Sequence, residues 1–288
     1  MQRSIWCEIC WHKGEQRVVE GKPHIAVALL PQVVAVAHAA AAQILTIYEA
    51  GFSVEEKADH SPLTDADLAA HAAIVSGLSV LTPALPVLSE ESAEIPFEVR
   101  RQWQQYWLVD PLDGTREFIK RNGEFTVNIA LIDRGAPVLG VIVVPTSGVA
   151  YFAAQGVGAY KQAARGEPQQ IKTCAFNEQS IVVASSRSHG SGALEDFLAQ
   201  LGVCQQAVMG SSLKFCLVAE GVADLYPRFG LTSEWDSAAA HCIVQQAGGQ
   251  VFDLNLQPLR YNTKSSLLNP HFLVVGDCSQ DWARFLAL

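Results

Sequence analysis

A pair of acidic residues at the end of an apolar run could bind a metal ion. The segment WLVDPLDGT, residues 107–115, places Asp110 three positions before Asp113, with a proline between them and a glycine after them. Asp, Pro and Gly are also ordinary turn residues, so a simple turn is the competing interpretation. Such a turn can direct both carboxylates to one point and leave the Leu112 carbonyl free, and Thr115 adds a hydroxyl. Hard divalent cations prefer several oxygen ligands of this kind.

Other acids stand at the expected ends of strands or starts of helices. Asp67 lies at a helix start, Glu90 follows a short apolar segment, and Asp236 opens an alanine-rich segment. Taken singly, each is typical of a helix cap or a solvated surface. Gathered carboxylates, however, repel one another unless a metal, a proton or a cation neutralises them. Mg²⁺ commonly keeps some waters and completes its shell with substrate phosphate oxygens, so the acids favour a metal–phosphate site.

The elements that must position these residues follow from the hydrophobic pattern. Pro31 suits the first turn of a helix over residues 31–50, and Thr64 with Asp67 approximates a capping box at the start of a helix that reaches about residue 78. A strand is expected to end at Asp110, where the proline stops it. The pattern predicts further strands over 87–88, 126–132, 138–144, 149–153, 181–184 and 223–226, and further helices over 194–201, 212–220 and 236–247. The strands 126–132 and 138–144 are expected to form a hairpin that turns at Arg134 and Gly135, and Gly248 and Gly249 are expected to close the last helix.

This order of elements predicts an α/β (α+β) chain in two abutting halves. Residues 1–28 form a poorly patterned leader. Residues 29–175 read as an antiparallel sheet with helices and carry most of the candidate metal ligands. Residues 176–288 alternate between strand and helix and carry Asp236.

The composition restricts the class of function. The 288 residues are 49% hydrophobic and 17% charged, which is typical of a chain that buries a core. The net charge of −9 argues against nonspecific binding to nucleic acid or anionic membranes. The apolar stretch 33–47 is shorter than the roughly 20 residues of a spanning helix, so no integral membrane segment is expected. Seven scattered cysteines indicate a reduced, cytoplasmic protein, and we interpret Cys7, Cys10 and His12 as a chance grouping.

Two long segments resemble the signatures of the inositol monophosphatase superfamily, a group of lithium-sensitive, Mg²⁺-dependent phosphatases. They are WLVDPLDGTREFIK (107–120) and WDSAAAHCIVQQAGG (235–249). The segments SPLTDADLAAH, PVLSEE, NGEFTVNIALID, SSRSH, GSSLKFCLVAEG and LYPRFG resemble its bacterial bisphosphate nucleotidase branch. The resemblance runs from about residue 29 to residue 275. It implies a layered αβαβα sandwich.

The resemblance also implies roles for individual residues. One Mg²⁺ would be held by Glu90, Asp110 and the Leu112 carbonyl. A second would be held by Asp110, Asp113 and Asp236. Glu90 would also help to hold a third, looser ion through water. Asp67 and Thr115 would position the attacking water. The residues implied in substrate binding are Glu90, Leu112, Asp113, Gly114, Thr115, Ser188, His189, Gly210, Lys214, Arg228 and Asp236. Lys214 and Arg228 could equally be surface charges, and His189 a structural hydrogen-bonding residue. Arg116, Lys120 and Arg121 could add a local positive field.

The implied reaction converts adenosine 3′,5′-bisphosphate and water to AMP and phosphate, with 3′-phosphoadenylyl sulfate as a second substrate. The role would be clearance of this by-product of sulfate assimilation. An inositol phosphatase or sugar bisphosphatase on the same fold, and a catalytically inactive binding protein, are the alternatives. The partner would be a small nucleotide bisphosphate, with no nucleic acid. The chain would be a monomer or homodimer, free in the cytoplasm or peripheral at the cytoplasmic face of the inner membrane.

Overall fold

The computed structural model of the chain describes residues 25–56, 62–186 and 192–286. In this part of the chain, seven strands form one sheet in the order β3-β4-β5-β6-β7-β8-β9, and five form another in the order β11-β10-β12-β14-β13. The first sheet comprises β3 (Val87–Ser89), β4 (Gln105–Asp113), β5 (Thr126–Asp133), β6 (Ala136–Val144), β7 (Val149–Ala154), β8 (Gly158–Gln162) and β9 (Gln169–Ile171). The second comprises β10 (Ile181–Ser185), β11 (Cys204–Val208), β12 (Leu225–Arg228), β13 (Gln250–Asp253) and β14 (Phe272–Val275). The short strands β1 (Val54–Glu56) and β2 (Pro62–Thr64) pair separately.

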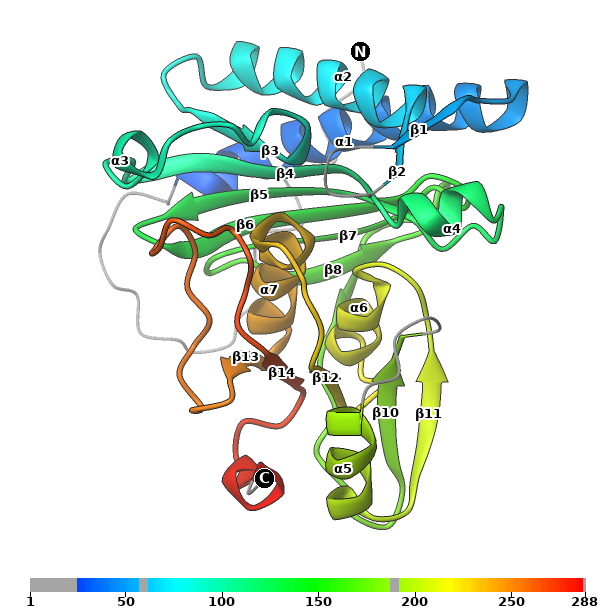
Figure 1. Ribbon diagram of the computed structural model, residues 1–288, viewed down its shortest axis with the longest axis vertical. Helices are drawn as coiled ribbons and strands as arrows, with labels where there is room; N and C mark the ends of the chain where they lie inside the picture. The colour runs from blue at the N-terminus through cyan, green and yellow to red at the C-terminus, as the bar shows by residue number, and fades with distance from the viewer. Residues whose placement is uncertain (1–24, 57–61, 187–191, 287–288) are drawn as a thin grey trace.

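Helices separate and cover the two sheets (Figure 1). The long helices α1 (Ile25–Ala50) and α2 (Asp65–Leu81) cover one face of the large sheet, and α6 (Leu213–Ala219) and α7 (Glu234–Ala247) lie between the sheets. Helix α5 (Gly192–Leu201) and a 3-10 turn (Trp282–Phe285) pack on the far face of the small sheet. The short helices α3 (Phe97–Arg100) and α4 (Thr115–Ile119) flank β4, and a second 3-10 turn (Glu90–Ser92) follows β3. The layers confirm the predicted αβαβα sandwich.

The central strand β5 shows why the layers form. Val127 and Ile129 pack in the core beneath α1 and α2, whereas Ala130 and Ile132 face the core around α6 and α7. Successive strand residues point to opposite faces, and here both faces are covered. The strand is therefore apolar from Ile129 to Ile132, and the predicted hairpin of β5 and β6 is confirmed.

The first helix begins earlier than the sequence pattern predicted. Helix α1 starts at Ile25, so Pro31 lies inside it rather than in its first turn. Ala26, Leu29 and Leu30 are buried against the same core as the rest of the helix, and this packing extends it towards the N-terminus. The predicted leader thus overlaps the helix from residue 25, and its first 24 residues lie outside the described part. The limits predicted for the two halves, 29–175 and 176–288, stay a prediction.

Two strand ends also differ from the prediction. Strand β4 does not stop at Asp110 but continues to Asp113. The register shifts between these two residues, and such an irregularity accommodates a proline within a strand. Strand β12 is displaced along the chain from the predicted 223–226 and ends at Arg228.

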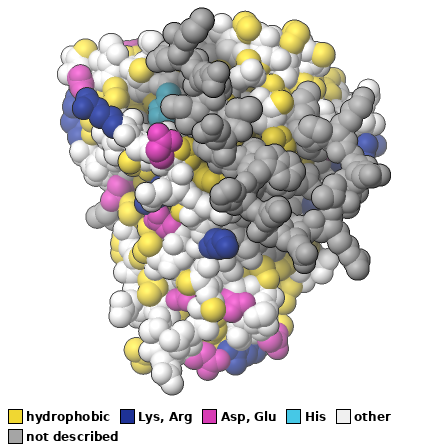
Figure 2. All heavy atoms as spheres, turned by 180° about the vertical axis from the view of Figure 1, so that it is seen from behind, with side chains coloured by type: hydrophobic (Ala, Val, Ile, Leu, Met, Phe, Trp, Pro, Cys, Tyr) yellow, Lys and Arg dark blue, Asp and Glu magenta, His cyan; other side chains and the backbone are white. Residues whose placement is uncertain are grey.

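Among the described residues, α1 is long and apolar enough between Ala26 and Ala50 to cross a membrane by length and composition alone. Its buried side chains belong to the core shared with α2 and the large sheet, which accounts for its apolar character. On the face in Figure 2, the coloured Lys and Arg side chains lie in separate small groups, and acidic side chains lie between several of them. The expectations about membranes and nucleic acid stay predictions.

Candidate active site

The site begins at the irregular end of β4. Asp110 pairs with Asn128, and Asp113 pairs with Thr126. Between these two pairs, β4 therefore contains one residue more than β5. This extra residue lets carboxylates from both positions turn towards the same end of the sheet. The Leu112 N–H donates to Asp110 Oδ1 at 3.1 Å, which fixes the turn locally. Residues 110–113 therefore belong to the strand, and the turn lies at Gly114.

Thr115 links this turn to α2. Its hydroxyl lies 3.3 Å from Asp67 Oδ1 and 3.3 Å from the Leu112 carbonyl oxygen. The other carboxylate oxygen of Asp67 accepts from the Thr64 N–H at 2.7 Å and the Thr64 hydroxyl at 2.6 Å. The predicted capping box of α2 is confirmed, and it leaves one oxygen of the buried Asp67 turned to Thr115. The two residues predicted to position water therefore lie side by side.

The acids influence one another strongly. Burial raises the pKa of Asp110 well above its usual range, and the nearby carboxylates raise it further, Glu90 and Asp113 most. Burial also raises the pKa of Asp236, with further increases from Asp113 and Glu90 that are offset in part by Arg228. Residues far apart in the sequence thus converge on one region of negative charge, as the sequence analysis expected.

Asp113 joins the end of β4 to the loop before α6. Its Oδ2 accepts from the Ser211 hydroxyl and the Ser212 N–H, each at 2.6 Å, and from Asn128 Nδ2 at 3.4 Å. Ser211 adopts a left-handed conformation with φ 53°, which is uncommon outside glycine. The loop before α6 is therefore held against the end of β4 in a constrained shape.

Asp236 occupies the third position of α7, and its Oδ2 accepts from the Ser233 N–H at 2.9 Å. The helix starts two residues before the predicted position, and Gly248 ends it in a left-handed conformation as predicted. Asp236 thus caps its own helix and faces the site together with Asp113.

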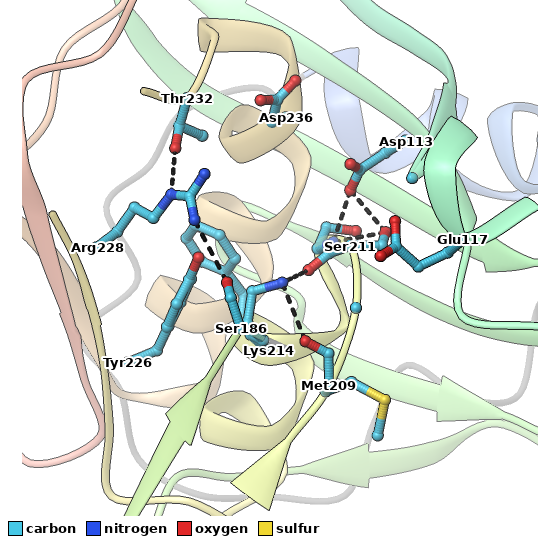
Figure 3. Close-up of a pocket in the computed structure, with 14 residues that line it drawn as sticks. Asp113, Glu117, Ser186, Met209, Ser211, Lys214, Tyr226, Arg228, Thr232 and Asp236 are labelled. Carbon is cyan, nitrogen blue, oxygen red and sulfur yellow. Dashed lines mark hydrogen bonds between the residues drawn. The ribbon is translucent and has the colours of Figure 1, made fainter. Parts of the chain in front are cut away.

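Acids and cations share one cavity of about 130 Å³ (Figure 3). In this view, Asp113 and Asp236 lie on one side, and Lys214 and Arg228 lie across from them. The predicted residues that line the cavity are Asp113, Gly114, Gly210, Lys214, Arg228 and Asp236.

Both cations are integrated into the fold. Lys214 is only 6% exposed and donates to the carbonyl oxygens of Met209 and Ser211, which excludes the surface-charge interpretation. Burial lowers its pKa to about 8, so its ammonium group stays mostly charged at neutral pH. Arg228 Nε donates to the Thr232 hydroxyl at 2.7 Å.

Some predictions lie elsewhere, and some lining residues were missed. Ser188 and His189 fall outside the described residues. Arg121 stacks over the Tyr48 ring at 4.8 Å, and the exposed Arg116 and Lys120 are not among the described lining residues. The sequence analysis missed Glu117, Ser186, Met209, Ser211, Ser212, Phe215, Tyr226 and Thr232 as lining residues. Most of them stand within a few positions of the recognised motifs, and that proximity was the available signal.

The donor set fits a divalent cation in chemistry and charge. Asp113 and Glu90 raise the pKa values of Asp110 and Asp236, and a bound cation would relieve this repulsion. In the described part of the chain, no three His, Cys, Asp or Glu side chains are arranged so that they could hold a metal ion as they stand. Hydrogen bonds from the protein engage part of the set, including Oδ2 of Asp113 and of Asp236. The ligand assignments therefore stay predictions.

Comparison with known proteins identifies the group to which this fold belongs. A family model described as the inositol monophosphatase family matches residues 27–279. The chain belongs to the inositol monophosphatase family.

Relatives within the inositol monophosphatase family refine the assignment. The 3′(2′),5′-bisphosphate nucleotidase CysQ of Escherichia coli strain K12 is 52% identical over 248 residues, which cover 85% of this chain and 99% of the relative. The crystal structure of CysQ from Bacteroides thetaiotaomicron is 43% identical, with a TM-score of 0.75, and the match covers 85% of this chain and 96% of that one. SuhB from Bartonella henselae is 26% identical with the same TM-score, over 90% and 98% of the two chains. The prediction that the chain is an enzyme, a phosphatase of this family, is confirmed.

Proposed function

We propose that the chain is a Mg²⁺-dependent 3′(2′),5′-bisphosphate nucleotidase that hydrolyses adenosine 3′,5′-bisphosphate to AMP and phosphate. 3′-Phosphoadenylyl sulfate would be a second substrate. The curated relatives with this activity support the proposal, since one of them is 52% identical and is covered almost completely. The proposal includes a cytoplasmic location and clearance of a by-product of sulfate assimilation.

One observation carries the choice of a substrate with two anionic groups. The cavity places Lys214 and Arg228 opposite the acidic pair Asp113 and Asp236. The acids suit a cation and the phosphate that reacts, whereas the buried Lys214 and the half-buried Arg228 across the cavity suit a second phosphate. A substrate with a single phosphate would leave this second charged region without a partner.

Each residue has a role in the proposed reaction. The Thr115 hydroxyl, 3.3 Å from both Asp67 Oδ1 and the Leu112 carbonyl, can donate to either and accept a hydrogen bond from the attacking water. Asp67 thereby orients Thr115, and the water approaches phosphorus opposite the leaving ribose oxygen. Lys214, Arg228 and the Gly210 loop orient the rest of the nucleotide.

The predicted ligand groups are Glu90, Asp110 and the Leu112 carbonyl at one position, and Asp110, Asp113 and Asp236 at another. Glu90 contributes to a looser third position. Mg²⁺ held there supplies a lower pKa for bound water and compensates the charge that develops on the phosphate oxygens. Lithium is expected to inhibit by competing at one of these positions, and an unchanged rate at millimolar lithium would contradict that expectation.

A side-by-side assay tests the substrate. Phosphate release is measured from adenosine 3′,5′-bisphosphate, inositol 1-phosphate and fructose 1,6-bisphosphate, each with added Mg²⁺. We expect the largest kcat/KM for the nucleotide. Faster turnover of the inositol or sugar phosphate would favour the alternative of an inositol phosphatase or sugar bisphosphatase.

The variant Asp113→Asn tests the site and the alternative of an inactive binding protein. Loss of the carboxylate charge should reduce kcat by about 100-fold or more at any Mg²⁺ concentration. The exposed Asp196 on α5 provides the control Asp196→Asn, which should match the wild type. Full activity of Asp113→Asn would show that the site is misplaced, and an inactive wild type would favour a binding protein.

A further inference from the structure

The first turn of α7, which carries Asp236, is held by a segment without regular structure. The Glu234 N–H donates to the Leu267 carbonyl at 2.8 Å, and the Asn269 N–H donates to the Thr232 carbonyl at 2.8 Å. Asn269 Nδ2 also donates to the Ser233 carbonyl at 2.8 Å. The position of this turn, and of the carboxylate on it, therefore depends on how residues 262–269 are themselves fixed.

Residues 263–266 are exposed, and the segment is anchored at its start by Asn262. The Asn262 N–H donates to Oε2 of the fully buried Glu234 at 2.8 Å. Its side chain makes a reciprocal pair with Arg100 from α3, accepting from Arg100 Nη1 and donating to the Arg100 carbonyl at 2.6 Å. Arg100 Nη2 also donates to the Ser265 carbonyl.

Arg100 is unusual because a guanidinium group is almost completely buried at 1% exposure. Burial of a charge is costly unless hydrogen bonds compensate it, and here neutral acceptors on the loop 262–265 bind both Nη atoms, while Nε has no partner among the described residues. Asn262 in turn adopts a left-handed conformation with φ 56°, which Asn adopts more readily than most residues other than glycine. Neither residue is among the described residues that line the cavity.

We propose that Arg100 and Asn262 form a buried clamp that sets the position of the first turn of α7, and with it the Asp236 carboxylate. Both are positioning residues for the reaction, so this inference rests on the proposed function. The clamp joins α3, next to the large sheet, to the helix that lies between the sheets. Displacement of a ligand by a fraction of an ångström is expected to lower activity because catalytic groups require close alignment.

The test uses Arg100→Met, Asn262→Gly and the double variant in the full chain. Glycine suits the left-handed backbone and keeps the N–H to Glu234, so Asn262→Gly removes only the side-chain link. The neighbouring Arg101 contacts the same Phe97 ring but is 56% exposed, so Arg101→Met is the matched control.

Three quantities are measured: the Mg²⁺ concentration for half-maximal activity, kcat/KM, and amide hydrogen exchange of residues 233–237 in metal-free protein. Both single variants should lower kcat/KM by about 10- to 100-fold and raise the Mg²⁺ requirement. Exchange in the first turn of α7 should accelerate on the order of tenfold. The double variant should lose little more than the worse single variant, because both act through one link.

The clamp is overturned if the variants melt earlier but keep exchange at 233–237 and the Mg²⁺ requirement within about twofold of the wild type. Additive losses in the double variant would also overturn it. Should Arg100→Met not fold, Asn262→Gly decides the question. If the wild type does not hydrolyse the nucleotide, the proposed function fails, and the exchange measurement still decides the clamp.

Discussion

Gly210 offers a sharp test of how the two halves form the site. A Cβ at this position would lie 2.9 Å from the Glu124 carbonyl oxygen and 3.0 Å from Glu117 Cγ. Ordinary van der Waals contacts begin near 3.4 Å, so Gly210→Ala requires a shift of about 0.5 Å between the loop and the start of β5. The nearest atom belongs to the backbone and cannot rotate away.

This displacement should affect both stability and catalysis. Overpacking of this kind costs about 1–3 kcal/mol, which a domain with about 5–15 kcal/mol of stability survives. The same loop supplies the Ser211 hydroxyl and Ser212 N–H that bind Asp113 at 2.6 Å. A 0.5 Å movement would lengthen these bonds to about 3.1 Å and weaken them, and each bond to a charged group contributes about 1.5–3 kcal/mol when fully formed. We therefore expect kcat/KM to fall by at least about tenfold.

The assay combines urea unfolding with steady-state kinetics on adenosine 3′,5′-bisphosphate. Gly192→Ala is the matched control, because nothing lies within 4 Å of its added Cβ and the change suits the start of α5. That variant should be neutral or slightly more stable. If Gly210→Ala matches Gly192→Ala in both unfolding free energy and kcat/KM, the close approach of the two halves does not shape the site.

Three further predictions concern single side chains. Thr115→Val should lower kcat by about 100-fold with little change in KM, whereas Thr115→Ser should stay within about tenfold of the wild type; equal rates of the two variants in single-turnover assays would contradict the role of the hydroxyl. Arg228→Met should raise KM for adenosine 3′,5′-bisphosphate by about tenfold or more and should change KM for adenosine 3′-monophosphate less. An equal change in KM for both nucleotides would show that Arg228 does not bind a second phosphate. Burial lowers the pKa of His241 from 6.5 to about 4, so the unfolded chain binds a proton in a pH range where the folded chain does not. This stabilisation is complete above pH 6.5 and is lost as the pH falls to about 4, a change of up to about 3 kcal/mol. In urea unfolding between pH 4 and 7, His241→Gln should reduce the dependence of the unfolding free energy on pH. An unchanged dependence would show that other groups cause it.

Local sequence signals were reliable where local interactions decide the structure. The capping box from Thr64 to Asp67 was predicted because its hydrogen bonds join residues three apart. Gly248 was predicted to close α7 for the same reason. Pro31 misled the prediction because packing of Leu29 and Leu30 against the core outweighs a local start signal.

The loop before α6 shows the limit of such signals. Nothing near Ser211 in the sequence indicates that its hydroxyl binds Asp113, 98 positions away. Likewise, nothing near Arg100 in the sequence indicates that the fold buries it against Asn262. Contacts of this kind depend on which faces of distant elements pack together, and the hydrophobic periodicity of the sequence does not specify this packing.

Residue type and short spacing specify the kinds of chemistry available: oxygen donors at the ends of strands and starts of helices, a hydroxyl beside them, and motifs that identify the family. In contrast, Asp113 and Asp236 share a cavity with Lys214 and Arg228 only in the folded chain, since two sheets must first pack on α6 and α7. Burial then raises the pKa values of Asp110 and Asp236 and lowers that of Lys214, because desolvation depends on the whole fold.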